Sequence, residues 1–178
     1  MKRTRPRQAG FTLLELLVTC AIIGTLAAIA VPVFAGETRR AKGDSEVSAF
    51  FTELRVREEQ FQNENGTYLS TGASESVTFP ASPSASPQSI ATQPATWNQL
   101  KVRVPESTAR CAYVVMTGTP NNGTVGAVAA GSFGFVRSST RNWYYVLAHC
   151  DLDGDSAKDA YYFVSSDDPQ VKSINPGH

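Results

Sequence analysis

The residue whose chemistry is most out of place in this sequence is Glu15. It is the single acid in a largely apolar run, Phe11–Phe34. A carboxylate inside a hydrophobic membrane helix costs on the order of 3 kcal/mol, and such a group is usually retained because a partner satisfies it. We therefore expect a cation on another helix to meet Glu15. The alternative is that the carboxylate lies near the lipid headgroups, where it reaches water and has no special role.

The run itself predicts a membrane-spanning helix. About 24 residues reach about 36 Å as an α-helix, which is enough to cross the hydrocarbon core of a bilayer. The preceding segment, Met1–Gly10, is basic and has no acid, so the positive-inside tendency keeps it in the cytoplasm and exports everything after Phe34. A secretory signal cleaved near Ala35 is the alternative, and Glu15 argues against it. The basic residues of this leader are Lys2, Arg3, Arg5 and Arg7.

The string Gly10-Phe11-Thr12-Leu13-Leu14-Glu15-Leu16 resembles the processing site of the type IV pilin and type II secretion pseudopilin family. The resemblance implies that prepilin peptidase, a membrane aspartyl peptidase, cleaves between Gly10 and Phe11, and that Phe11 is then N-methylated. It also implies partners, namely other pilin subunits in a helical filament and an inner-membrane assembly platform. Residues 53–61, followed by Asn65-Gly66-Thr67-Tyr68, also look like the helix end and first loop of pilins.

Cleavage at this point would give Glu15 a partner. The new amine of Phe11 on one subunit and Glu15 of its neighbour would attract strongly in a packed helical bundle of low dielectric, and this pairing would set the subunit register. Loss of the leader's four cations leaves 12 of the 16 basic residues against 16 acidic ones, a net charge of −4. Nucleic acid is therefore not expected as a direct ligand through a broad positive field.

Residues 35–65 predict an amphipathic continuation of the same helix. Apolar residues recur there at spacings of three, four and seven, as on a helix with one face against a core. Asn65-Gly66 supplies a stop, because glycine suits the left-handed conformation at a helix C-terminus. We expect one helix from Phe11 to about Glu64. The apolar stripe consists of Val47, Phe50, Phe51, Leu54 and Phe61.

The rest of the chain predicts a loop and then a small antiparallel β-sheet, which with the helix gives an α+β, pilin-like fold. Residues 66–96 are rich in Ser and Pro and favour a loop. Residues 97–178, the expected globular head, alternate short runs of Val, Tyr and Phe with turn residues. Asn121-Asn122-Gly123 is a candidate hairpin turn, and glycines make 125–136 a strand with bulges or partly a loop. The predicted strands are Leu100–Val104, Arg110–Thr117, Val125–Val136, Asn142–Cys150 and Asp159–Ser165.

Two of the three cysteines are candidates for a disulfide. Cys111 and Cys150 both lie in the exported head, where an oxidising compartment permits a bond. Closing a loop of about 40 residues would contribute about 4 kcal/mol in the chain-entropy model. Two free thiols are the alternative. Cys20 lies in the membrane run and is expected to pack as a small apolar residue.

An acidic loop, Asp151-Leu152-Asp153-Gly154-Asp155 with Asp159 beyond it, is a candidate calcium site. Alternating carboxylates around a glycine turn can supply several of the oxygen ligands that calcium prefers, although the spacing is not that of an EF-hand. A solvated acidic turn explains the same residues, since Asp and Gly both suit turns. Both interpretations stay open, and no other cofactor is expected. The candidate metal ligands are Asp151, Asp153, Asp155 and Asp159.

The sequence contains no constellation that predicts catalysis. Its two histidines, His149 and His178, lack zinc-ligand spacing, and it has no nucleophile elbow or phosphate loop. We therefore expect a structural subunit of a type IV pilus-like filament and not an enzyme. It would be stored in the bacterial inner membrane as a single-pass protein with a cytoplasmic N-terminus, and then extracted into an extracytoplasmic pilus or pseudopilus. The alternatives are a pseudopilin of a type II secretion or DNA-uptake system and, outside the family, an anchored binding or sensor domain that does not polymerise.

Overall fold

The computed structural model describes residues 11–104, 106–155 and 157–178. The chain divides into two compact units, the first ending at Gly36 and the second comprising Glu37–His178. The predicted leader, with Gly10 at its end, lies outside the described residues.

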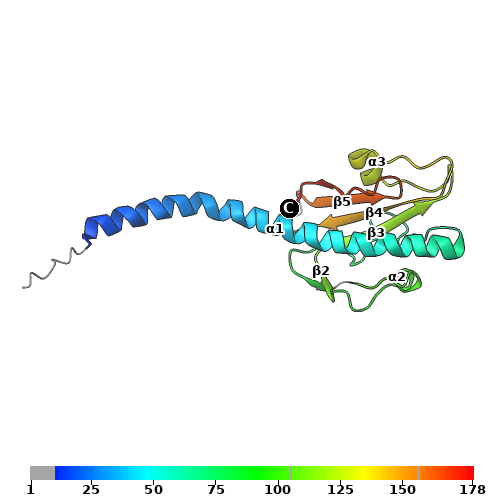
Figure 1. The fold of residues 1–178 in the computed structure, drawn as a ribbon, viewed down its shortest axis with the longest axis horizontal. Coiled ribbons are helices and arrows are strands. Elements are labelled where there is room, and N and C mark those ends of the chain that lie inside the picture. Colours follow the sequence, from blue (N-terminus) through cyan, green and yellow to red (C-terminus); the bar gives the residue numbers. More distant parts are fainter. Residues whose placement is uncertain (1–10, 105, 156) are drawn as a thin grey trace, which may run out of the picture. The chain divides into compact units, whose positions relative to one another are not determined.

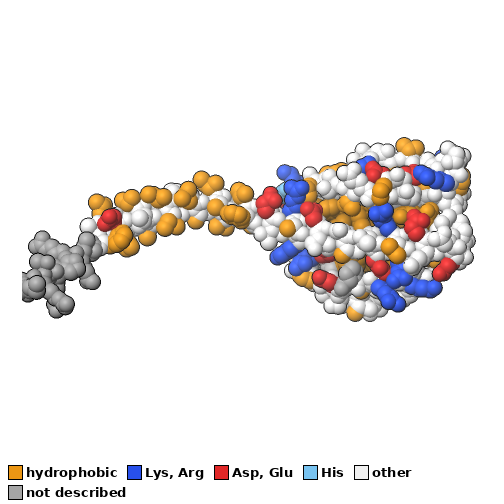
Figure 2. Space-filling view, in the orientation of Figure 1, with side chains coloured by type: hydrophobic (Ala, Val, Ile, Leu, Met, Phe, Trp, Pro, Cys, Tyr) orange, Lys and Arg blue, Asp and Glu red, His pale blue; other side chains and the backbone are white. Residues whose placement is uncertain are grey.

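The first unit is helical from Leu13 onward. Helix α1, Leu13–Asn65, begins here and continues into the second unit (Figure 1). In the apolar run its large side chains are exposed, with Leu13 at 82% and Ile29 at 72%, and Figure 2 shows hydrophobic side chains over the surface of this part. A window of 18 residues has a mean hydropathy of 2.4, so by length and composition the helix can cross a membrane.

The second unit is built on a four-stranded antiparallel sheet with the strand order β3-β4-β5-β6. In its register Val146 on β4 lies between Val115 on β3 and Val164 on β5. The strands of this sheet are β3 (Ala112–Gly118), β4 (Trp143–Cys150), β5 (Ala160–Ser165) and β6 (Lys172–Ile174). The remaining elements are a ribbon of β1 (Gln88–Ser89) with β2 (Thr108–Ala109) and two short helices, α2 (Ala95–Gln99) and α3 (Ala127–Phe133).

One face of the sheet packs against the second half of α1 (Figure 1). The predicted apolar stripe is confirmed, since Val47, Phe50, Phe51 and Leu54 are at most 2% exposed and Phe61 is partly buried beside them. The ring of Phe50 stacks on that of Tyr113, with centroids 4.4 Å apart. Gly43 permits the close approach of the loop after β4, because a Cβ there would lie 2.6 Å from Leu152 Cδ1. The sheet residues in this core include Tyr113, Val115, Tyr144, Val146, Tyr162 and Val164.

Helix α3 lies over the other face of the sheet, where a strand was predicted over Val125–Val136. That prediction is wrong. The carboxylate of Glu75 accepts hydrogen bonds from the N–H groups of Val128 and Ala129, both at 2.9 Å, and so satisfies donors that a first helical turn leaves free. Gly134, with a φ of 65°, then ends the helix. The deciding contact comes from a loop about 50 residues away, so the local pattern could not reveal it.

Two further local predictions need correction. Leu100–Val104 is not a strand, because α2 ends there with Leu100 buried and Lys101 in a left-handed conformation at a φ of 58°. Asn121-Asn122-Gly123 forms a turn inside the long connection between β3 and β4, not a two-residue hairpin. The segment expected as a loop, 66–96, contains β1 and the start of α2.

Three predicted strands, Arg110–Thr117, Asn142–Cys150 and Asp159–Ser165, correspond to β3, β4 and β5 with ends shifted by at most two residues. The sequence did not predict β6 or the β1–β2 ribbon. The predicted α+β, pilin-like architecture of one long N-terminal helix with antiparallel sheets is confirmed.

A buried carboxyl group joins α1 to the loop that follows it. Glu58 is fully buried, and its Oε2 accepts the N–H of Leu69 at 2.9 Å. Among the described residues, its Oε1 has no hydrogen-bond partner. Burial raises the pKa of Glu58 from 4.5 to about 8; the Leu69 N–H opposes this increase and the charge of Glu59 adds to it. Glu58 is therefore protonated in the folded protein at neutral pH.

Glu58→Gln should make the stability of the protein less dependent on pH. The pKa of Glu58 is higher in the folded protein than in the unfolded chain. Its contribution to the free energy of unfolding is therefore fully present below pH 4.5 and is lost as the pH rises to about 8. At about 1.4 kcal/mol for each pKa unit, the free energy of unfolding that is lost is on the order of a few kcal/mol. Glutamine retains an oxygen for Leu69 and does not ionise, so the fall in unfolding free energy between pH 5 and pH 9 should shrink.

The measurement is denaturant unfolding of the full chain in detergent micelles at both pH values. Glu64→Gln is the matched control, because Glu64 is an exposed acid on the same helix with only a 3.6 Å surface ion pair to Lys101. Equal pH dependence in the wild-type and Glu58→Gln proteins would contradict the assignment.

Candidate functional site

The start of α1 is organised by two side chains on either side of its first turn. The hydroxyl of Thr12 accepts the N–H of Glu15 at 3.2 Å, and Glu15 Oε2 accepts the N–H and the hydroxyl of Thr12 at 3.3 and 3.2 Å. This reciprocal arrangement is a capping box, with Thr12 as N-cap and Glu15 at the third helical position. It explains why the helix begins at Leu13 and not at Phe11 as predicted. Sequence analysis missed it, although the Thr-x-x-Glu spacing signals it.

The capping box brings Glu15 and Phe11 to the same helix end. Phe11 precedes the N-cap and is 81% exposed, and both contacts to Glu15 fall on one oxygen, Oε2. In the described residues of the first unit Glu15 is the single acid. A second chain can therefore reach a carboxylate that lies on an otherwise apolar, exposed helix surface. Gly10, the residue before the predicted cut, lies outside the described residues.

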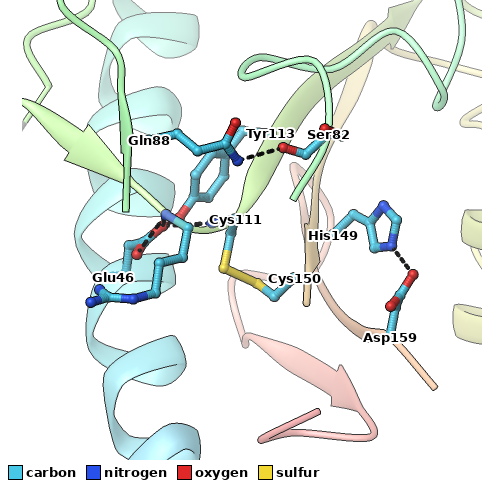
Figure 3. Close-up of a disulfide and its surroundings, with 9 residues drawn as sticks. Glu46, Ser82, Gln88, Cys111, Tyr113, His149, Cys150 and Asp159 are labelled. Atoms are coloured by element: carbon cyan, nitrogen blue, oxygen red, sulfur yellow. Dashed lines mark hydrogen bonds and ion pairs between the residues drawn. A yellow bond between two sulfur atoms is a disulfide. The ribbon is translucent and has the colours of Figure 1, made fainter. Parts of the chain in front are cut away.

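The predicted disulfide between Cys111 and Cys150 is present (Figure 3). It links the residue before β3 to the last residue of β4, and both cysteines are fully buried. Cys20, the free cysteine of the described residues, lies exposed on the apolar part of α1.

A second link to the start of β3 comes from Glu46 on α1 (Figure 3). Its Oε1 accepts the N–H groups of Arg110 and Cys111, both at 2.9 Å, and the hydroxyl of Tyr113 at 3.0 Å. Together the carboxylate and the disulfide attach β3 to the helix on one side and to β4 on the other. The sequence did not single out Glu46, because its partners, two backbone N–H groups and the Tyr113 hydroxyl, lie more than 60 residues away.

The acidic loop after β4 uses its carboxylates to hold its own backbone. Asp151 accepts the N–H of Gly154 at 2.7 Å, Asp153 that of Asp155 at 3.1 Å, and Asp155 that of Ala157 at 3.1 Å. Among residues that the structure describes, no group of three or more His, Cys, Asp or Glu side chains is placed to hold a metal ion. Calcium binding stays a prediction, and calorimetric titration of the protein with calcium would test it.

The remaining predicted metal ligand, Asp159, is paired with a histidine. Asp159 Oδ2 lies 2.5 Å from His149 Nε2 (Figure 3). The ring of His149 stacks on that of Tyr161, with centroids 4.6 Å apart. In the same way Asp153 Oδ2 lies 2.9 Å from His178 Nδ1. The structure thus divides the four aspartates between a turn and two histidine contacts and does not gather them around one point.

Comparison with known proteins finds matches for the N-terminal part of the chain. Residues 5–31 match the family model for the prokaryotic N-terminal methylation motif. The type IV major pilin protein PilA of Myxococcus xanthus is 41% identical over 68 residues, which are 38% of this chain and 30% of that protein. The type IV wide pilus major component PilA4 of Thermus thermophilus is 39% identical over 64 residues, 36% of this chain and 48% of that protein.

These matches span from less than a third to about half of the length of the relatives. No solved structure matches the chain. The chain carries the prepilin-type N-terminal methylation motif and is homologous, over more than a third of its length, to type IV pilins.

Proposed function

We propose that this chain is a structural subunit of a type IV pilus-like filament, assembled through its N-terminal helix. The observation that carries the proposal is an exposed apolar helix with one acid four residues after Phe11, inside a methylation motif. The two named relatives are pilus components, which favours a filament over an anchored sensor. Among the described residues of the head, Glu46, Glu75, Asp151 and Asp159 use their carboxylates to hold backbone N–H groups or a histidine.

The apolar surface of the first unit has to be shielded from water both before and after assembly. Side chains such as Leu14, Ile23 and Phe34 are 65–71% exposed, and a contiguous surface of this kind marks a membrane or protein contact. Before assembly the bilayer of the inner membrane covers it, with the basic leader in the cytoplasm. After assembly the helices of neighbouring subunits cover it.

Prepilin peptidase prepares the subunit for this exchange. Cleavage between Gly10 and Phe11 removes the leader and leaves an amine one residue before the capping threonine. Glu15 keeps its Oε2 on Thr12 and offers its Oε1 to the amine of a neighbouring subunit. The pair forms only when a second helix packs beside the first. Neutralisation of the amine and the carboxylate is therefore coupled to the correct register of the subunits in the filament. The inner-membrane assembly platform is the partner that moves the subunit between the two environments.

The mature protein should begin with N-methylated Phe11. Mass spectrometry of the chain purified from cells with the processing machinery measures this directly. A polypeptide that still begins at Met1 in such cells would contradict the processing step and, with it, the filament proposal.

Glu15→Gln should insert into the membrane normally and yet reduce the filament yield by more than about tenfold, because an uncharged amide cannot neutralise a neighbour's amine in a low-dielectric bundle. Filaments sheared from cells and quantified by immunoblot measure the yield. Glutamine retains a side-chain oxygen for Thr12, so the capping box is largely kept.

Thr12→Val is the matched control. It removes the capping hydroxyl and leaves the charge of Glu15 in place, so filaments should form at close to the normal yield. Equal losses in the two variants would show that helix capping, and not charge pairing, is what assembly requires.

A further inference from the structure

A cavity of about 390 Å³ opens beside α1 in the second unit. Its first lining residue along the helix, Thr38, comes four residues after Phe34, where the apolar run ends. At 1.5 Å per residue this separation is about 6 Å along the helix. If the apolar run lies in the bilayer as proposed above, the helix residues that line the cavity would follow directly after the membrane-spanning segment, next to the lipid headgroups.

Two cations, Lys42 and Arg110, line this cavity. Neither Lys42 nor the guanidinium of Arg110 forms an ion pair with any acid in the part of the chain that the structure describes. Arg110 binds Glu46 through its backbone N–H alone, so its side chain is not used by that contact. Ser45 also lines the cavity and carries a hydroxyl group. Ammonium, guanidinium and hydroxyl donors are together the groups that bind a phosphate.

Two carboxylates, Glu46 and Glu106, also line the cavity, and they differ in how many contacts they already make. Glu46 already accepts two backbone N–H groups and the hydroxyl of Tyr113. Glu106 is exposed and forms no ion pair among the described residues. A purely anionic ligand would be repelled by these charges. A ligand with a phosphate and an ammonium group would match both the free cations and the free acid.

We propose that the cavity binds the headgroup of a phosphoethanolamine lipid, with its phosphate on Lys42 and Arg110 and its ammonium on Glu106. A primary ammonium can donate charge-assisted hydrogen bonds to a carboxylate, which a quaternary ammonium cannot do. The carbon surfaces of Ala41, Ala49 and Phe50 complete the lining and suit the glycerol end of the lipid. The inference rests on the proposed storage of the subunit in the membrane, where the lipid would hold the head against the bilayer surface before extraction.

The test is a titration of the full chain in detergent micelles, followed by amide chemical shifts, with soluble short-chain phospholipids. Dihexanoyl phosphatidylethanolamine should bind saturably and more tightly than its phosphatidylcholine and phosphatidylglycerol analogues. The double variant Lys42→Gln/Arg110→Gln should weaken binding by about tenfold or more, since two charged contacts to the phosphate are lost. Glu106→Gln should remove the preference for ethanolamine over glycerol headgroups while leaving phosphate-dependent binding.

The matched control is Lys158→Gln/Arg137→Gln, which removes the same charges outside the cavity lining and should leave the titration unchanged. Tighter binding of the phosphatidylglycerol analogue, equal loss in the control, or saturation by inorganic phosphate at the same concentration would overturn the proposal. The measurement uses the monomer, so a subunit that binds the lipid and fails to form filaments would refute the proposed function alone.

Discussion

The structure depends on one constraint: the apolar side chains along a single helix have to be covered in two different environments. Up to Phe34 every turn of α1 is apolar apart from Glu15 and a few hydroxyls, and its side chains are left exposed. From Val47 onward the same helix buries only one face, and that face makes the core of the head. The change of pattern along α1 separates the part that lipid or neighbouring helices must cover from the part that the chain covers itself.

Polar contacts and a disulfide in the second unit attach the sheet and its neighbouring loop to this helix. Glu46 and the disulfide act at the same place, the start of β3, and Glu58 fastens the loop that leaves the helix. In the described residues both glutamates point their carboxylates at backbone N–H groups, which otherwise would lie buried without an acceptor. The aromatic contacts, such as Phe50 on Tyr113, then fill the space that these polar contacts define.

The sequence predicted what depends on periodicity and composition. The helix, its apolar stripe and three of the four strands of the main sheet follow from local patterns. The disulfide was predicted from the compartment expected for the two cysteines of the head. Prediction from the sequence failed where a distant side chain decides the local conformation. Residues 127–133 form a helix because Glu75 supplies the acceptor for its first turn, and the three residues of β6 are too few to show a pattern. Glu15 was identified as the key acid, while its contact with Thr12 was not.

The capping box at the start of α1 has a consequence for the life cycle of the protein. Both of its members, Thr12 and Glu15, lie on the retained side of the proposed cut, so the first turn owes its stability to residues that trimming does not remove. The proposed cleavage would therefore leave the first turn of the helix folded. If the chain is stored and assembled as proposed, its membrane form and its filament form would share the same folded helix end.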